Sequence, residues 1–237
     1  MNLPKPNKGK PLFLEIEGRK VYRYPIKTQI ILSGDDLYDI VAKAVQPFLK
    51  EFYKGRLFVG VTEKAVASSQ GRGFPISEIK PGRLANFLTK YVHKSKFGIG
   101  LGSPETMQIA IQEAGALRII FASAVAAITK LFGIKGMFYR LAGNVVRSID
   151  GPVAYALPPF NTYAVLGAKD GDKVAAKLSQ ILKVPTFIAD SNDIGVNIIG
   201  SSSIEKNELS IIKLAYQDNF WGNTDEQTPV AIIYWQD

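Results

Sequence analysis

Four oxygen-bearing side chains, Asp190, Ser191, Asn192 and Asp193, follow a short apolar run in the C-terminal half of the chain. Carboxylate, hydroxyl and amide oxygens are the ligands that hard divalent cations prefer, and such cations often carry bound phosphates. The same residue types also favour tight turns, because their side chains hydrogen-bond the nearby backbone. Taken alone, the four residues favour a polar turn, with a cation and phosphate site as the alternative.

The chain contains no cysteine and a single histidine, His93. Disulfides, thiolate metal sites and a cysteine nucleophile are therefore excluded, and zinc sites that need several histidines or cysteines are disfavoured. A Ser-His-Asp mechanism would have to use His93, which lies in a basic, amphipathic stretch and is interpreted as a surface residue. Any metal is expected to be held by oxygen ligands.

The balance of charge favours anionic partners. The 237 residues include 29 Lys and Arg against 21 Asp and Glu, which gives a net charge of +8. Nucleotides, phosphorylated cofactors, nucleic acid and acidic membrane surfaces all fit this charge. The basic residues are scattered, and the N-terminal Lys5, Lys8 and Lys10 are interpreted as a solvated tail, so a nucleic-acid-binding module is disfavoured and no nucleic-acid partner is expected.

Apolar spacing predicts the elements that position these residues. In the N-terminal half we expect an arm and lead-in strand (1–25), a strand (Lys27 to Leu32), a helix (Leu37 to Phe52) and a strand (Arg56 to Val61). Gly34-Asp35-Asp36 precedes the helix and supplies its cap. After the last of these strands the chain becomes polar, from Thr62 to Gly73.

The C-terminal half has the same mixed character. We expect helices (Gly82 to Val92, Pro104 to Ala114, Asp172 to Leu182, Ile204 to Phe220) and strands (Val153 to Leu157, Thr186 to Ala189, Val230 to Tyr234). Ser103 is the expected cap of the helix that begins at Pro104. Because helices and strands alternate without a strict βαβ rhythm, the predicted fold is an irregular α/β or α+β structure with mixed sheets.

The most hydrophobic segment, Ala114 to Phe132, is close to the length of a membrane-spanning helix. Arg118 and Lys130 interrupt it, it is the single candidate, and globular sequence flanks it. Its Ala, Ser and Gly content suits close packing in a core or an oligomer interface. We therefore expect a buried helix of a soluble protein, no membrane partner and, by default, a cytoplasmic location.

Several segments resemble, in the same order, motifs of the γ-glutamyl ligase family of coenzyme F420. Gly34-Asp35-Asp36 resembles that family's Gly-Asp-Asp, and the stretch from Gly55 to Arg72 resembles its apolar strand and Ala-Glu-Gly-Arg turn. Further resemblances lie at Ser103-Pro104-Glu105, Ala156 to Pro159 (Leu-Leu-Pro-Pro), Ile188 to Asn192 (Ile-Thr-Asp-Thr-Asn) and Thr228 to Ile233 (Thr-Pro-Val-Val). Each motif is weak alone, but their collinear order extends from about Ile26 to Tyr234.

The resemblance implies GTP-dependent ligation of L-glutamate onto the deazaflavin coenzyme, with two divalent ions, Mn or Mg. It also implies a homodimer of two-part α/β subunits that interlock. Here the ligase-like domain would span residues 26–237, with an apolar helical insertion near 114–135. The partners would be a nucleotide and a small anionic acceptor, which suit a basic chain.

The resemblance also implies roles for individual residues. Asp190 would bind a metal ion with the Ser191 hydroxyl as a second ligand, and Asn192 would contact the nucleotide. The phosphate or acceptor contacts would be Lys64, Gly71 and Arg72, and further metal ligands would be Glu208 and Asp150. In this ordered series the segment at Asp190 favours a site over a turn.

Three departures from the family pattern concern the ligands. No carboxylate follows Gly143 where the family has a metal-binding Asp, so Asp150 would have to substitute from downstream. Gln70 replaces the Glu before Gly-Arg, and a neutral amide is a poorer ligand for a hard cation. The segment from Asp193 to Val196 replaces the family's Gly-Arg.

Two functions stay open: an amide-bond ligase, on this acceptor or another, and a non-catalytic relative that binds a phosphorylated ligand.

Overall fold

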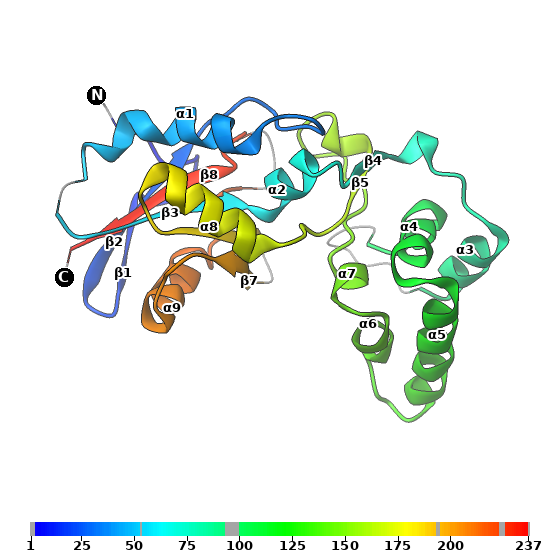
Figure 1. The fold of residues 1–237 in the computed structure, drawn as a ribbon. Coiled ribbons are helices and arrows are strands. Elements are labelled where there is room, and N and C mark those ends of the chain that lie inside the picture. Colours follow the sequence, from blue (N-terminus) through cyan, green and yellow to red (C-terminus); the bar gives the residue numbers. More distant parts are fainter. Residues whose placement is uncertain (1–2, 53, 93–99, 193–194, 223–225, 237) are drawn as a thin grey trace. The chain divides into compact units, whose positions relative to one another are not determined.

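The computed structural model describes residues 3–52, 54–92, 100–192, 195–222 and 226–236, with only the backbone of Asn192. His93 and Asp193 therefore lie outside the described residues. Contacts divide the chain into two units (Figure 1): unit 1 comprises Met1–Gly71 and Ala168–Asp237, and unit 2 comprises Arg72–Gly167. Helices and strands are mixed along the chain, which confirms the predicted α/β class.

A mixed β-sheet forms the centre of unit 1 (Figure 1). Among the described residues its order is β1 (Phe13–Ile16), β2 (Arg19–Ile26), β8 (Val230–Trp235), β3 (Arg56–Thr62), β6 (Thr186–Asn192) and β7 (Gly195–Ser201). β3 and β6 run parallel, and the other neighbouring strands pair antiparallel. The C-terminal ends of β3 and β6 therefore meet at one edge of the sheet.

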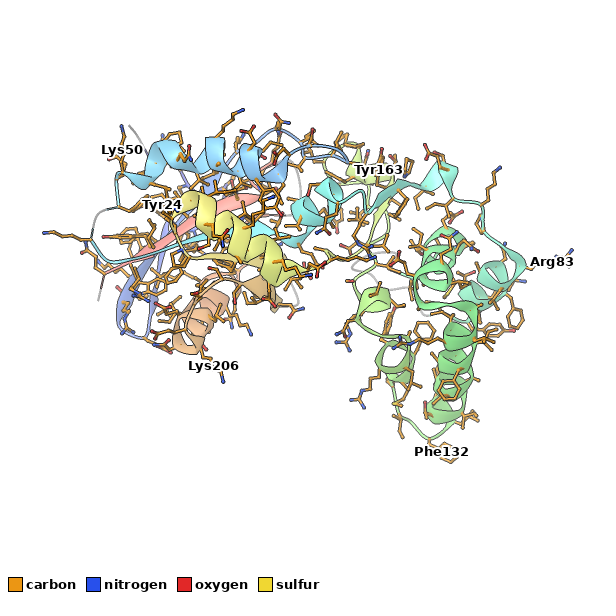
Figure 2. The ribbon with its side chains drawn as sticks, viewed as in Figure 1. Tyr24, Lys50, Arg83, Phe132, Tyr163 and Lys206 are labelled. Carbon is orange, nitrogen blue, oxygen red and sulfur yellow. The ribbon has the colours of Figure 1, made fainter. Side chains whose placement is uncertain are left out.

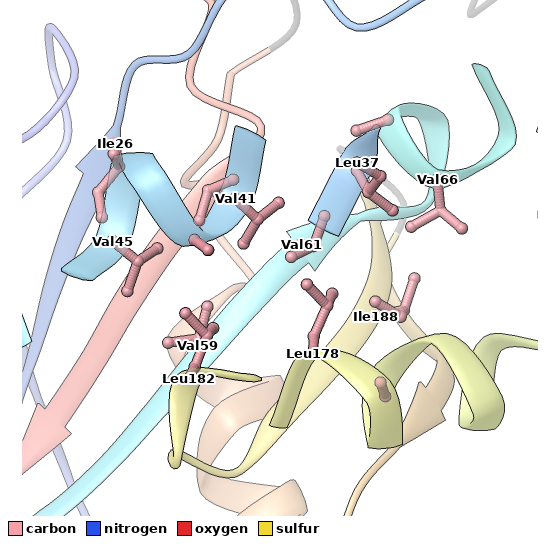
Figure 3. Packing of buried hydrophobic residues seen from close by; sticks show 14 of the residues in the cluster. Ile26, Leu37, Val41, Val45, Val59, Val61, Val66, Leu178, Leu182 and Ile188 are labelled. Carbon is pink, nitrogen blue, oxygen red and sulfur yellow. The ribbon is translucent and has the colours of Figure 1, made fainter. Parts of the chain in front are cut away.

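Helices cover both faces of this sheet. α1 (Leu37–Leu49) and α8 (Gly171–Leu182) lie on one face, and α9 (Lys206–Ala215) lies on the other. Figure 3 shows the first layer, where Val61 of β3 lies among apolar side chains of α1 and α8. Phe187 of β6 belongs to the core on the α9 face. The two-residue alternation of the strands thus supplies both cores.

Local sequence explains where two of these helices begin. The Asp36 carboxylate accepts hydrogen bonds from the backbone N–H groups of Tyr38 and Asp39, at 2.9 and 3.2 Å, and so caps α1 as predicted. At α8, the helix start lies directly against β7. A Cβ atom on Gly200 would lie 2.1 Å from the carbonyl carbon of Gly171, so both positions need glycine for this close approach.

The predicted strand from Lys27 to Leu32 is wrong, because β2 ends at Ile26. Beyond it the Thr28 N–H donates to the Gln227 carbonyl at 3.3 Å, and the Gln227 amide donates back to the Thr28 carbonyl at 2.6 Å. Gln227 has a φ of +54°, a left-handed conformation that does not continue a strand ladder.

The polar stretch after β3 contains a helix that the sequence analysis did not predict, α2 (Glu63–Ser69). The Thr62 hydroxyl caps it by accepting from the Ala65 N–H at 3.3 Å. The helix buries the small side chains Ala65 to Ser68, and this small-residue face has little of the apolar periodicity that predicts helices.

The N-terminal segment is packed against unit 1, so the expectation of a solvated tail is wrong for part of it. The Asn7 amide donates to the Thr228 hydroxyl at 2.8 Å and to the Trp221 carbonyl at 3.2 Å. The Lys10 ammonium donates to the Asp218 carbonyl.

Unit 2 is mainly helical. Its elements are β4 (Gly73–Pro75), α3 (Arg83–Leu88), α4 (Pro104–Ala114), α5 (Ala116–Leu131), α6 (Met137–Ala142), α7 (Asn144–Arg147) and β5 (Tyr163–Val165). β4 and β5 pair antiparallel. Ser103 caps α4 through reciprocal bonds with Thr106, and Pro104 is its first residue, as the sequence predicts. Met107, Ile119 and Leu166 lie in the core of this unit.

The predicted strand from Val153 to Leu157 is wrong. The Ala156 N–H donates to the Val153 carbonyl at 3.0 Å, which closes a turn. Pro152 and Pro158 bracket this segment, and proline has no N–H to offer a strand partner.

The apolar helix α5 differs from its prediction in burial. Within it, Ile119 and Ala122 are buried, whereas Leu117, Phe121 and Leu131 are exposed. Burial in the core is therefore confirmed for only one face of α5, and the alternative of an oligomer interface stays a prediction. Within the described residues no single helix is long and apolar enough to cross a bilayer, and α4 with α5 meets those limits only as a pair bent by 115°.

Candidate functional site

Two predicted site residues lie at the C-terminal edge of the parallel strands. In the register of β3 and β6, Val61 is opposite Ile188 and Thr62 is opposite Ala189. Lys64 follows Thr62 by two residues, and Asp190 follows Ala189 directly. Ligands of α/β sheets typically bind just beyond the C-terminal ends of parallel strands. The structure thus places Lys64 and Asp190 at the same edge of the sheet.

Asp190 and Ser191 belong to opposite faces of the sheet. The irregularity in the pairing of β6 with β7 places the extra residue, Ile199, in β7, so β6 keeps its regular alternation. The Ser191 hydroxyl donates to the Tyr216 carbonyl, at 2.9 Å, on the α9 face. Asp190, the residue before Ser191, is on the face of α1 and α8, as is Ile188 two residues earlier. The structure does not bring this carboxylate and this hydroxyl together on one side of the strand.

Beside Lys64, the neighbouring Glu63 is a residue that sequence reasoning missed. One carboxylate oxygen of Glu63 accepts from the Ala168 N–H at 3.0 Å, which fixes the start of the segment that leads to α8. In the sequence Glu63 lies directly between the end of β3 and Lys64, and this position could have marked it as a candidate site residue. Two acidic residues, Glu63 and Asp190, therefore lie at the same edge of the sheet as Lys64.

Gln70, which replaces a family glutamate, has a structural role. Its side-chain oxygen accepts from the Lys169 N–H at 2.9 Å, and its amide nitrogen donates to the Lys169 carbonyl at 2.8 Å. A glutamate could accept from the N–H but could not donate to the carbonyl when ionised. The amide thus joins the two chain segments of unit 1 at the point where unit 2 is inserted.

Gly71 and Arg72 adjoin this connection. Gly71 has a φ of +70°, and a Cβ there would lie 3.0 Å from the Ser33 hydroxyl oxygen, so glycine suits the position. The Arg72 guanidinium is largely buried in unit 2, where it donates to the Gly167 carbonyl at 2.6 Å and to the Glu113 carboxylate at 3.1 Å. The structure thus gives Arg72 partners within its own unit.

Glu208 lies far from Asp190 within unit 1. Its carboxylate accepts from the Arg56 Nε at 2.6 Å and from the Glu205 N–H at 3.0 Å, and so completes the N-terminal cap of α9. Arg56 begins β3, whereas Asp190 lies beyond the end of that strand. A seven-residue strand spans about 20 Å, so Glu208 and Asp190 do not share one metal site. Asp150 belongs to unit 2, where its backbone pairs with Val165.

The described residues do not form the ligand set of a metal pair. No group of three or more His, Asp or Glu side chains in this part of the chain could hold an ion. A single Mg²⁺ would need fewer protein ligands than a pair, because Mg²⁺ typically binds through one or two carboxylates and takes its other ligands from substrate phosphates and water.

A shallow pocket of about 340 Å³ lies between the start of α1, α2 and α8. Asp35 and Asp36 of the Gly-Asp-Asp motif line it together with Ser69 and Gln70, so two of the family-like motifs meet there. Sequence reasoning missed Lys177 in its wall, whose ammonium lies 3.9 Å from the centre of the Tyr38 ring. No motif marks this lysine, because it reaches the pocket from a helix remote in sequence.

The comparison with protein families agrees with these motifs. Residues 25–135 match the family described as F420-0:Gamma-glutamyl ligase, whereas no curated protein matches the chain. The match includes Lys64, Gly71 and Arg72, and it ends before Asp150, Asp190 and Glu208. The matched residues make up just under half of the chain, and over this part they support membership in the F420-0:gamma-glutamyl ligase family.

Proposed function

We propose that the chain is an amide-bond ligase of the γ-glutamyl type that uses a nucleoside triphosphate, GTP in the first instance, and a divalent cation. The observation that carries this proposal is the placement of Lys64 and Asp190 at one edge of the sheet in a member of this family. The acceptor would be a small anionic molecule with a free carboxylate, which suits the net charge of +8.

In the proposed reaction an oxygen of the acceptor carboxylate forms a bond to the γ-phosphorus, the P–O bond to the β-phosphate breaks, and the nucleoside diphosphate leaves. The glutamate amine then attacks the carbonyl carbon of the acyl phosphate: the amide C–N bond forms, the C–O bond to phosphate breaks, phosphate leaves, and the amine releases a proton to solvent. Lys64 would neutralise charge on the phosphates and hold them in position. Asp190 would hold Mg²⁺ or Mn²⁺, which when bound supplies further charge neutralisation.

Calorimetric titration of GTP and ATP with Mg²⁺ or Mn²⁺ tests the proposed site. We expect Asp190→Asn and Lys64→Gln each to weaken nucleotide binding at least about tenfold, because each removes a charged contact. Glu15→Gln is the matched control, since Glu15 is an exposed carboxylate on β1, remote from β6 in the strand order. If Asp190→Asn binds cation and nucleotide as tightly as the parent, the edge is not the site.

The second candidate function is a non-catalytic relative that binds a phosphorylated ligand. It is favoured by the engagement of Gln70 with Lys169 and by the separation of Glu208 from Asp190. A phosphate-release assay with glutamate and candidate acceptors separates the two functions. Release that requires both glutamate and an acceptor would rule out the non-catalytic function, whereas nucleotide binding without release would support it.

A further inference from the structure

One face of α5 exposes a continuous apolar stripe. Leu117, Ile120, Phe121, Ile128 and Leu131 recur at helical spacing and are all exposed, with Leu117 and Leu131 at 86% and 85%. The stripe continues into the turn after the helix, where Phe132 is 77% exposed and Ile134 is 49% exposed. An exposed apolar patch that runs along a whole helix and over its end marks a docking surface.

The turn at the end of this stripe is held by hydrogen bonds. The N–H groups of Phe132 and Ile134 both donate to the Thr129 carbonyl, at 3.1 and 3.0 Å, and the Gly133 N–H donates to the Lys130 carbonyl at 3.1 Å. These bonds satisfy the last carbonyls of α5. Figure 2 shows Phe132 at the outer end of the turn between α5 and α6. The apolar tip is therefore formed before it meets a partner.

The charge around the stripe has one sign. Residues 114–149 contain no Asp or Glu, and their cations are Arg118, Lys130, Lys135, Arg140 and Arg147. Lys130 and Lys135 flank the tip on either side. Two copies of this surface packed face to face would bring like charges together, whereas an anionic surface would be complementary.

We infer that the α5 stripe and the turn to α6 dock on the surface of a lipid bilayer that contains anionic lipids. Leu131, Phe132 and Ile134 would enter the boundary between head groups and acyl chains, and Lys130 and Lys135 would contact the lipid phosphates. From the sequence alone we expected no membrane partner, because α5 was predicted to be buried. The exposed apolar face of α5 and the uniformly positive charge of residues 114–149 now favour a membrane partner.

Vesicle flotation of the full chain tests the docking surface. We expect binding to vesicles of phosphatidylcholine and phosphatidylglycerol (3:1), and binding at least about tenfold weaker for Leu131→Ser with Phe132→Ser, because two large apolar side chains leave the interface. Ile181→Ser is the matched control, since Ile181 is an exposed apolar residue of unit 1. Unchanged binding by the double variant would overturn the proposal.

The charges are tested separately. Lys130→Gln with Lys135→Gln is expected to weaken binding about 25-fold at low salt, from about fivefold for each cation near an anionic surface. Vesicles of phosphatidylcholine alone should bind the parent chain as weakly as this variant binds the mixed vesicles. Equal binding to both vesicle types would contradict the role of the cations.

A Phe132→Trp variant reports insertion directly. The natural Trp221 and Trp235 are buried in unit 1 and give a constant background. We expect the fluorescence emission of the introduced tryptophan to shift to shorter wavelength when the mixed vesicles are added. Circular dichroism verifies that the variant is folded. No shift would contradict docking through the tip. The surface would instead belong to an interface with a second copy if two results were found together. The chain would self-associate in a concentration-dependent way that the Leu131 and Phe132 changes abolish, and it would not bind vesicles.

Discussion

In unit 1 helices cover both faces of the sheet, so the apolar residues of each strand reach one of two cores. Unit 2 packs its helices around one core and leaves the outer face of α5 exposed. Both units contain a largely buried arginine paired with a carboxylate, Arg23 with Asp218 in unit 1 and Arg72 with Glu113 in unit 2. Apolar content alone therefore does not predict burial, because burial depends on whether a second layer covers the element.

The largest expected contrast concerns two phenylalanines. Phe187 is fully buried in unit 1 and Phe132 is exposed in unit 2. We expect Phe187→Ala to lower the free energy of unfolding by about 3–5 kcal/mol and Phe132→Ala to change it by less than about 0.5 kcal/mol. Urea unfolding followed by tryptophan fluorescence, which reports on unit 1, and by circular dichroism measures both. Similar losses in the two variants would show that the α5 face is covered.

The paired arginines give the next contrast. Arg23 also donates to the Ala215 and Pro11 carbonyls and has no exposed surface, so Asp218→Ala leaves a buried charge without its anion. We expect a loss of about 2–4 kcal/mol for Asp218→Ala and about 1–2 kcal/mol for Glu113→Ala, because the Arg72 side chain retains some exposure to water. Urea midpoints of the two variants and the parent test this order, and the reverse order would contradict it.

A smaller effect is expected where the two segments of unit 1 join. Gln70→Glu removes the donor to the Lys169 carbonyl and sets an anionic oxygen against it, which should cost about 1 kcal/mol. Gln180→Glu, at an exposed position of α8, is the matched control. Thermal unfolding measures both variants. A stabilised Gln70→Glu would refute the amide connection, and a gain in Mn²⁺ affinity would identify the position as a potential ligand.

The smallest effect at neutral pH concerns Tyr216. Burial raises the pKa of this phenol well above its ordinary value of 10.0, and no described group hydrogen-bonds its hydroxyl. In the folded protein the Tyr216 phenol therefore stays neutral above pH 10, whereas in the unfolded chain it ionises near pH 10. The stability that burial of the neutral phenol contributes is thus fully present below about pH 10 and is lost as the pH rises above that value. Tyr216→Phe should be within about 1 kcal/mol of the parent at pH 7 and should lose less stability above pH 10. Unfolding midpoints at pH 7 to 11 test this, and parallel curves would refute it.

Much of unit 1 was predictable because strong local signals agree with the final packing. The cap at Asp36, the apolar strand from Arg56 and the last strand from Val230 all lie as expected. The strand predicted from Lys27 failed because Thr28 pairs with Gln227, whose left-handed backbone does not continue a strand ladder. That pairing joins residues remote in sequence, which local patterns do not record.

The candidate site was predictable only in part. The shared edge of Lys64 and Asp190 depends on the parallel pairing of β3 and β6, which the collinear motifs suggested but spacing could not establish. Glu208 was placed by motif spacing, yet its partner is Arg56 at the other end of β3. The role of Gln70 depends on Lys169, a residue that follows the whole of unit 2. These contacts are set by tertiary structure.

The order of strands in unit 1 has a consequence for synthesis. β8 lies between β2 and β3, although it is synthesised after all the other described strands of this sheet. Unit 2 is continuous in sequence and can fold as soon as residue 167 has emerged, whereas the edges of β2 and β3 wait unpaired for β8. We therefore expect chains truncated before Val230 to contain a folded unit 2 beside an incomplete, aggregation-prone sheet.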